Sequence, residues 1–219
     1  MKAILIFALF FSIPAIASAQ TAPDRSDTQS WNDLQLTVPL SKKVDFVTKL
    51  SLRFGSNVTK LAENRILFGF AFKPAKNLTV TPFYWQVHSR NPTTRKFSAE
   101  HQLDVAAVYR LPVGKYGLTH RSTYEYRIRT SGNSWRYRAL AGIDRSLPEK
   151  WIKDTKVFTT AEVFYDSKPR KWTRTRFTVG ISSKITKQLS LDVFYTRQND
   201  GYSRPGDLNV IGTTWKVRL

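Results

Sequence analysis

The chain has 219 residues, and its 35 Lys and Arg against 16 Asp and Glu give it a formal net charge of +19. An aromatic share of 13% excludes a disordered basic tail, which would lack residues to bury. The absence of cysteine excludes disulfide scaffolds, thiol nucleophiles, zinc–cysteine sites and lipid attachment through an N-terminal Cys. The length allows one or two domains, and the basic balance raises nucleic acid as the first partner to consider.

The first 19 residues have the three-part layout of a secretory signal peptide. Lys2 supplies the positive start, residues 3–13 form an apolar run, and the small residues 17–19 (Ala-Ser-Ala) suit a signal peptidase. The apolar run is too short for a membrane-spanning helix, which takes about 20 residues. We therefore expect an exported protein that is cleaved between Ala19 and Gln20.

Cleavage and export bear on the expected segments of the mature chain and on its partners. Residues 20–30 are polar and are expected to be a flexible N-terminal segment, followed by one domain over 31–219. An exported chain does not meet cytoplasmic nucleic acid, so we expect no nucleic-acid partner.

From residue 31 onward, polar and apolar side chains alternate with a period of two, which is typical of strands and not of helices. In 118–129, Leu118 and Tyr124 share one face, whereas Arg121 and Arg127 share the other. Eleven strands are predicted in this way, over 31–38, 44–54, 64–73, 78–88, 99–109, 118–129, 135–144, 155–165, 173–182, 189–197 and 208–219. Two read less clearly, because Pro82 interrupts one and Phe158 and Phe164 fall in the polar phase of another.

The connections between these strands differ in character. The compact ones lie around Ser41, Ala75 and Thr186, and the longer polar ones are 55–63, 89–98 and 198–207. Bacterial single-chain barrels have even strand numbers. We therefore favour twelve strands, with residues 20–30 adding a short strand or threading the lumen, and keep ten as the alternative.

Two architectures fit an antiparallel up-and-down meander of this kind. A transmembrane β-barrel points apolar residues to lipid and polar residues inward, and it is favoured by strands near the 9–11 residues that a tilted crossing needs. A soluble periplasmic β-barrel that binds an apolar ligand is the alternative. It would point Phe68, Phe70 and Phe72 inward and leave the basic residues on its exterior.

Aromatic residues and the C-terminus favour the membrane. Aromatics expected near strand ends, as in interfacial girdles, are Tyr84, Trp85, Tyr109, Tyr116, Trp135, Tyr137, Trp151, Tyr165 and Trp172. The last strand alternates and ends in the apolar phase at Leu219, which resembles the signal that outer-membrane barrels present to the barrel-assembly machinery. The predicted location is the cell outer membrane, with its lipids and lipopolysaccharide as partners.

Five segments carry a family resemblance: Trp31-Asn32-Asp33, 50–54 (Leu-Ser-Leu-Arg-Phe), 124–129 (Tyr-Glu-Tyr-Arg-Ile-Arg), 135–138 (Trp-Arg-Tyr-Arg) and 209–212 (Asn-Val-Ile-Gly). Together they resemble the bacterial family catalogued as domain of unknown function 2490, over essentially the whole mature chain. The resemblance implies an outer-membrane barrel of a Gram-negative bacterium. It brings no catalytic residues.

The strand phase sorts the charged residues. A basic cluster predicted to face the lumen comprises Arg53, Arg65, Arg121, Arg127, Arg129, Arg136, Arg138, Arg174 and Arg176, with Lys49 in the same phase. The carboxylates predicted to face it are Asp45, Glu100, Asp104, Glu125, Glu162 and Asp192. The same residues admit two interpretations: a salt-bridged, closed structural barrel, or a small channel whose cationic constriction favours small anions.

A second basic set lies in the longer loops. Its members are Lys60, Arg90, Arg95, Lys96, Lys168, Arg170, Lys171 and Arg204. These side chains suit charge-assisted hydrogen bonds to lipopolysaccharide phosphates, or they are simply solvated.

An outer-membrane lipid hydrolase or acyltransferase is the enzymatic alternative. His88-Ser89 and Glu100-His101 could meet between neighbouring strands, but no serine lies in a nucleophile motif. His101 and His120 fall in the lipid-facing phase. The three histidines lack metal-ligand spacing and the chain has no phosphate-binding loop motif, so we predict no enzyme, metal or cofactor.

Overall fold

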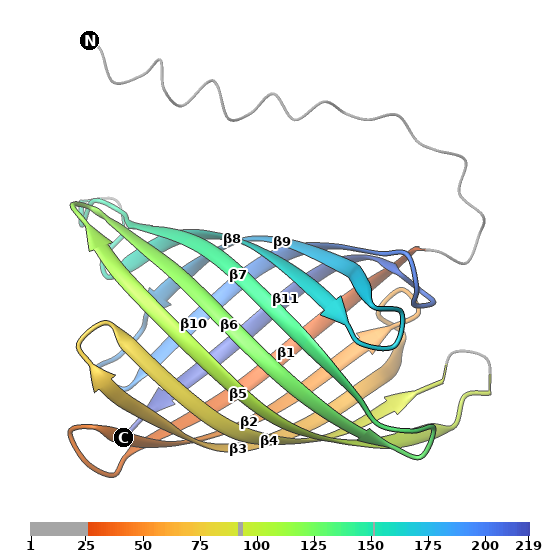
Figure 1. Cartoon of the computed structure of the whole chain (residues 1–219). Helices are drawn as coiled ribbons and strands as arrows, with labels where there is room; N and C mark the ends of the chain where they lie inside the picture. The colour runs from red at the N-terminus through yellow and green to blue at the C-terminus, as the bar shows by residue number, and fades with distance from the viewer. Residues whose placement is uncertain (1–25, 92–93, 151) are drawn as a thin grey trace.

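A computed structural model of the chain describes residues 26–91, 94–150 and 152–219, which form a closed barrel (Figure 1). Its strands are β1 (Ser26–Pro39), β2 (Val44–Gly55), β3 (Lys60–Ala75), β4 (Leu78–Arg90), β5 (Phe97–Val113), β6 (Tyr116–Arg129), β7 (Ser134–Ser146), β8 (Thr155–Asp166), β9 (Lys171–Lys184), β10 (Leu189–Asp200) and β11 (Asp207–Arg218). The described residues contain no helix with the length and hydropathy of a membrane crossing. The all-β barrel predicted from the alternation is confirmed.

The strand number of twelve, and ten as its alternative, are both wrong for the described residues, which form eleven strands. Neighbours in sequence pair antiparallel, so an odd count leaves the first and last strands running the same way. The barrel closes through a parallel pair, from Ser26 opposite Asp207 to Thr37 opposite Arg218. A parallel ladder satisfies the edge groups as an antiparallel one does, which is why closure does not need an even number.

β1 begins earlier than predicted, because residues 26–30, expected to be flexible, pair with β11 and extend the ladder. The signal peptide over 1–19, its cleavage site and residues 20–25 lie outside the described residues. The predicted loop 55–63 is also mostly strand: only residues 56–59 connect β2 to β3. Polar side chains near strand ends alternate weakly, so their sequence gives little sign that the ladder continues.

The turns lie at the two ends of the barrel. The end where β1 begins, called here the Ser26 end, carries the connections 56–59, 91–96, 130–133, 167–170 and 201–206 (Figure 1). The opposite end, called the Leu219 end, carries the other five turns and the C-terminus. The three connections predicted to be compact lie together at the Leu219 end, and the three predicted to be long lie together at the Ser26 end.

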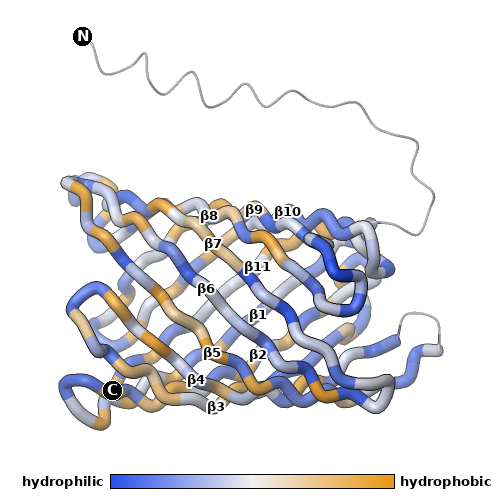
Figure 2. Tube along the Cα trace, in the orientation of Figure 1, coloured by the Kyte–Doolittle hydropathy of each residue, from blue (hydrophilic) through white to orange (hydrophobic). Residues whose placement is uncertain are grey.

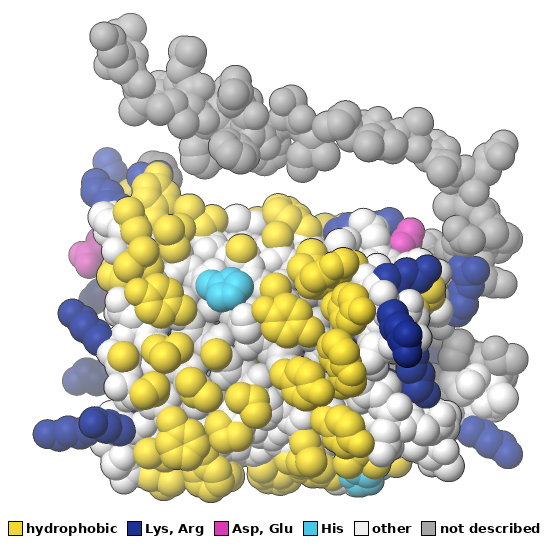
Figure 3. Space-filling view, in the orientation of Figure 1, with side chains coloured by type: hydrophobic (Ala, Val, Ile, Leu, Met, Phe, Trp, Pro, Cys, Tyr) yellow, Lys and Arg dark blue, Asp and Glu magenta, His cyan; other side chains and the backbone are white. Residues whose placement is uncertain are grey.

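The outer face of the barrel is apolar. Exposed hydrophobic side chains on it include Leu34, Leu50, Phe68, Phe70, Phe72, Leu103, Val105, Tyr124, Ile128, Val163, Phe177, Val179, Ile181, Val193 and Ile211. Hydrophilic and hydrophobic residues are mixed along the visible strands (Figure 2), and in Figure 3 hydrophobic side chains cover the middle while Lys and Arg gather towards both ends. Phe68 and Phe70 are 44% and 45% exposed. The prediction of the soluble alternative that these rings point inward is therefore wrong.

The inner face is mostly polar, with a few apolar side chains that fill the lumen. Trp31, Leu208 and Val210 form one buried cluster. Towards the Leu219 end, the ring of Phe194 lies against Gly212, where an added Cβ atom would come within 2.2 Å of it, and the ring of Phe158 lies against Gly180, where an added Cβ atom would come within 2.6 Å of it. Phe164 on β8 is 1% exposed. Its place in the polar phase of its strand thus reflects a ring inside the barrel.

Candidate functional site: an arginine-rich cavity in the lumen

A cavity of about 430 Å³ occupies the lumen at the Ser26 end. Seven of the nine predicted arginines line it: Arg53, Arg65, Arg127, Arg136, Arg138, Arg174 and Arg176. They come from β2, β3, β6, β7 and β9, and the pleat places them inward because alternate residues of a strand share a face. Arg121 and Arg129 lie outside this lining but pair with inward carboxylates. Seven inward-facing arginines from five strands thus surround the cavity.

The deepest ion pairs centre on Arg138. Its guanidinium donates to Glu125 at 2.7 Å and to Glu162 at 2.8 Å. Arg121 donates to the same oxygen of Glu162 at 2.8 Å. Both carboxylate side chains are almost fully buried. Three strands, β6, β7 and β8, are thus linked across the wall by one network.

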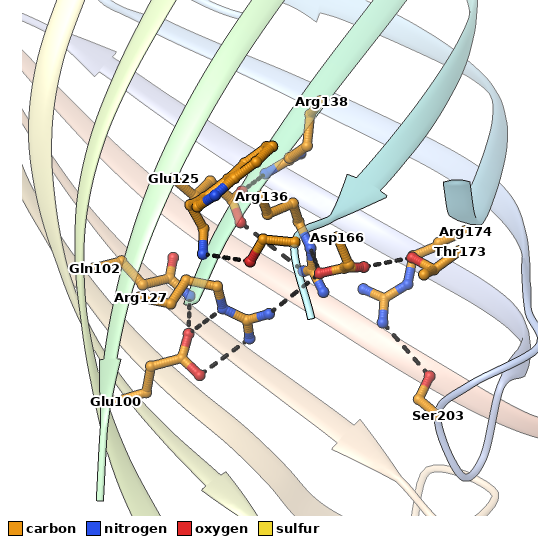
Figure 4. Close-up of polar contacts among 12 residues, drawn as sticks. Glu100, Gln102, Glu125, Arg127, Arg136, Arg138, Asp166, Thr173, Arg174 and Ser203 are labelled. Atoms are coloured by element: carbon orange, nitrogen blue, oxygen red, sulfur yellow. Dashed lines mark hydrogen bonds and ion pairs between the residues drawn. The ribbon is translucent and has the colours of Figure 1, made fainter. Parts of the chain in front are cut away.

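A second network lies nearer the Ser26 end and is drawn in Figure 4. Glu100 accepts two hydrogen bonds from Arg127, at 2.7 Å and 3.0 Å (Figure 4). It accepts another from Arg129. Asp166 accepts from Arg136 at 2.7 Å. These bidentate and charge-assisted contacts hold the guanidinium planes in fixed directions.

Besides Asp27 and Asp33 of β1, three carboxylates of the lumen at other strand ends were not predicted from the sequence. Glu63 lies 2.5 Å from Arg65 and 3.1 Å from Arg53, Asp166 pairs with Arg136, and Asp200 lies 2.5 Å from Arg174. All three stand at strand ends that we expected to be loop. Their phase relative to Arg65, Glu162 and Gln198 is the signal that could have found them.

The six predicted carboxylates all face inward in the structure. Asp45 pairs with Lys73 and Arg218, and Asp192 pairs with Lys216, towards the Leu219 end. Asp104 is 3% exposed, and its Oδ1 has no hydrogen-bond partner among the described residues. In the part of the lumen towards the Leu219 end, cations and carboxylates are thus closely balanced in number, unlike in the cavity.

Cations outnumber carboxylates in the lining of the cavity. The lining contains eleven Lys and Arg, against Asp27, Glu63 and Glu125. Four of these cations, Lys60, Arg90, Arg95 and Arg204, come from loops and strand ends at the Ser26 end. The cavity therefore presents a positive surface to a solute that enters there.

Two aromatic rings organise the guanidinium groups. The ring of Phe164 lies beneath Arg136, Arg138, Arg174 and Arg176, with centroid distances of 5.7, 4.9, 5.4 and 4.7 Å. The Trp31 ring lies 4.0 Å from Arg53 and 4.9 Å from Arg176. Cation–π contacts of this kind stabilise guanidinium groups that stand close together.

The histidines do not form the site proposed for a lipid-modifying enzyme. His88 contacts Asn64 at 3.2 Å, while Ser89 donates to Glu63. His101 contacts Tyr84 at 2.5 Å on the outer face. His88-Ser89 and Glu100-His101 are therefore each engaged elsewhere.

Among the described residues, His120 is the histidine whose ring contacts a serine. Its Nε2 lies 3.0 Å from Ser122 Oγ, which is 2.9 Å from the Tyr137 hydroxyl. Among the described residues no carboxylate orients His120, and no group of three or more His, Asp and Glu could hold a metal ion. This contact lacks the third group of a hydrolytic triad.

An apolar exterior around a lumen of paired charges defines the class of the protein: a closed β-barrel with a charged interior. The chain belongs to the family described as "Protein of unknown function (DUF2490)", whose model matches residues 28–209. The resemblance seen in the sequence is thus confirmed.

Solved structures give the fold independently. The NanC porin matches with a TM-score of 0.54 and 10% identity, over 88% of this chain and 99% of that chain. An anion-selective porin from Comamonas acidovorans matches with a TM-score of 0.42 and 10% identity, over 83% of this chain and 54% of that chain. At this identity the first match shows the fold alone, and the second is too weak to add to it. No curated protein matches the chain in sequence.

Proposed function

We propose that the protein is a non-enzymatic, porin-like barrel of the outer membrane of a Gram-negative bacterium, whose lumen admits small anions. The observation that carries this proposal is the cavity at the Ser26 end, with its excess of cations over carboxylates. Rings of Arg and Lys favour anions in pores by the same attraction. The competing proposal is a structural role for a closed barrel. The paired charges between the cavity and the Leu219 end favour it.

The outer face supports insertion into a membrane. Strands of 12 to 17 residues are long enough for a tilted crossing. A row of aromatic rings crosses β6 to β9. Tyr124 stacks on Trp135 and Trp135 on Tyr165, and Tyr165 meets Trp172 edge to face, with ring centroids 5.6 to 5.8 Å apart. Such a row suits the interface between lipid tails and headgroups. Trp151 of the predicted girdle lies outside the described residues.

A charge placed on this outer face tests membrane insertion. Val179→Arg, at the middle of β9 and 47% exposed, is expected to lower the free energy of unfolding in lipid vesicles by about 2–4 kcal/mol. The cause is the transfer of a guanidinium to the bilayer midplane. Urea titration followed by tryptophan fluorescence measures the change.

Val113→Arg is the matched control. Val113 is 48% exposed and ends β5 at the Leu219 end, where a charge reaches the headgroups. Its cost is expected to be about 0–1 kcal/mol. Equal effects at both positions would contradict a membrane-spanning orientation, as would recovery of the wild type in the soluble fraction after osmotic shock.

The lipid partners follow from the same orientation. We place the Ser26 end outside the cell, because the last strand would then end in the periplasm, where the barrel-assembly machinery acts. Lys168, Arg170, Lys171 and Arg204 then stand at the outer surface, and Lys171 lies 4.8 Å from the ring centre of Tyr202. Lipopolysaccharide phosphates are the anions these side chains would meet.

Conductance in planar bilayers tests the channel. An open lumen predicts current steps and, in a salt gradient, a reversal potential that shows anion selectivity. The full mature chain, refolded in detergent, is the sample, and a heat-dependent shift in gel mobility checks its fold. A barrel that inserts without conducting would overturn the channel and leave the closed structural barrel.

A further inference from the structure

Arg176 differs, in what holds it, from the other six of the seven predicted arginines that line the cavity. Each of the other six has a carboxylate oxygen within 3.1 Å. The carboxylate nearest to Arg176 is Glu162 at 4.0 Å, and that carboxylate already binds Arg121 and Arg138 at 2.8 Å. Arg176 is therefore the least neutralised of these seven inward-facing arginines among the described residues.

Aromatic packing and an amide, and not a carboxylate, hold this guanidinium in position. It contacts Trp31 of β1 and Phe164 of β8, two rings from separate parts of the barrel wall, and its Nε donates to Gln198 at 2.8 Å. A guanidinium is planar and weakly hydrated, so aromatic faces hold it well. With Nε engaged, the terminal N–H groups are the donors left to a ligand.

The wall next to Arg176 carries little negative charge. β10 and β11 contribute Gln198 and Leu208 to the lining. The amide of Gln198 also donates to the carbonyl of Gly206, and Gln29 accepts from the indole N–H of Trp31. These amides are satisfied by the protein, so they do not compete for the terminal N–H groups of Arg176.

We propose that the Arg176 guanidinium is the binding site for an oxyanion, a carboxylate or phosphate group, on a small solute in the cavity. The fork of two N–H groups matches two oxygens of such a group, and about 430 Å³ is the size of a small-molecule site. The inference rests on the proposed function, because the solute enters at the Ser26 end. Chloride is a single spherical acceptor, so it cannot form the two parallel hydrogen bonds that the fork makes to two oxygens.

Calorimetry on the refolded full chain in detergent tests the site. Inorganic phosphate and citrate, each titrated against sodium chloride at equal ionic strength, are expected to bind saturably. Arg176→Lys keeps the charge and loses the planar fork, so binding should weaken at least tenfold. Arg121→Lys, a luminal arginine outside the cavity lining, is the control and should bind within twofold of wild type. Arg176→Lys that binds as wild type, or phosphate and citrate without saturable heat, would overturn the proposal.

The aromatic contacts provide a charge-neutral variant. Phe164→Leu removes one ring from Arg176 and should weaken oxyanion binding several-fold. Phe158→Leu changes an inward phenylalanine of the same strand that has no guanidinium over its ring in the described residues, and binding should stay unchanged. Both variants are first checked for the heat-dependent gel shift. If Phe164→Leu does not fold, Trp31→Leu replaces it with the same expectation, and unchanged binding in the folded variant would count against the proposal.

Binding and conduction are measured separately, so the two proposals fail separately. Saturable phosphate binding without current would overturn the channel and support the site. Anion-selective current with phosphate and citrate no tighter than chloride would support the channel and overturn the site.

Discussion

Replacing Arg138 by methionine is expected to lower the free energy of unfolding by about 3 kcal/mol. Glu125 and Glu162, which Arg138 binds, are 4% and 6% exposed, and methionine would leave both without this guanidinium. The effect arises from buried charge without compensation, since methionine nearly preserves the length of the side chain. Urea unfolding of the refolded barrel measures the loss.

A surface pair on the same sheet provides the control. Lys156 lies 3.2 Å from Asp144, with exposed fractions of 55% and 29%. Lys156→Met should change stability by about 0–1 kcal/mol, because water solvates the carboxylate that remains. Adding Glu125→Gln to Arg138→Met should restore part of the loss. Equal stability of the two single methionine variants would show that water in the lumen already solvates Glu125 and Glu162.

Reversing charge in the cavity should invert the selectivity of the channel. Arg127→Glu combined with Arg136→Glu places two new carboxylates beside Glu100 and Asp166, which these arginines now bind at 2.7 Å. The cavity then attracts cations and repels anions. In a salt gradient across a planar bilayer, the reversal potential is expected to change sign.

The double change to glutamine separates charge from shape. Arg127→Gln with Arg136→Gln should reduce anion selectivity without inverting it. The pair Lys42→Glu and Lys43→Glu, in the turn at the Leu219 end, carries the same charge change outside the cavity and should leave the sign unchanged. An unchanged reversal potential in the Arg127 and Arg136 variants would show that ions pass elsewhere.

Much of the lumen could be read from the sequence because strand geometry is local. Alternate side chains point to opposite faces, and a charged side chain facing lipid is costly, so the phase of Arg136 and Arg138 follows from their own strand. Phe164 was visible as an exception to the alternation. Its position beneath four guanidinium groups was not, because that depends on which strands meet it across the barrel.

The number of strands and the pairing that closes the barrel could not be predicted from the sequence. The expectation of an even number came from other barrels, whereas the parallel pairing of β1 with β11 is a property of the closed structure. Residues 26–30 read as a polar tail, and they become strand because the edge of β11 offers them backbone partners.

The sequence by itself determined the all-β class, the apolar and charged faces, and the surplus of arginine on the charged face. Only the tertiary structure decided that Glu63, Asp166 and Asp200 join the network and that Arg176 packs against Trp31 and Phe164. The reason is physical: a period of two belongs to each strand alone. Contacts across the lumen depend on the stagger at which the sheet closes, to which all the strands contribute.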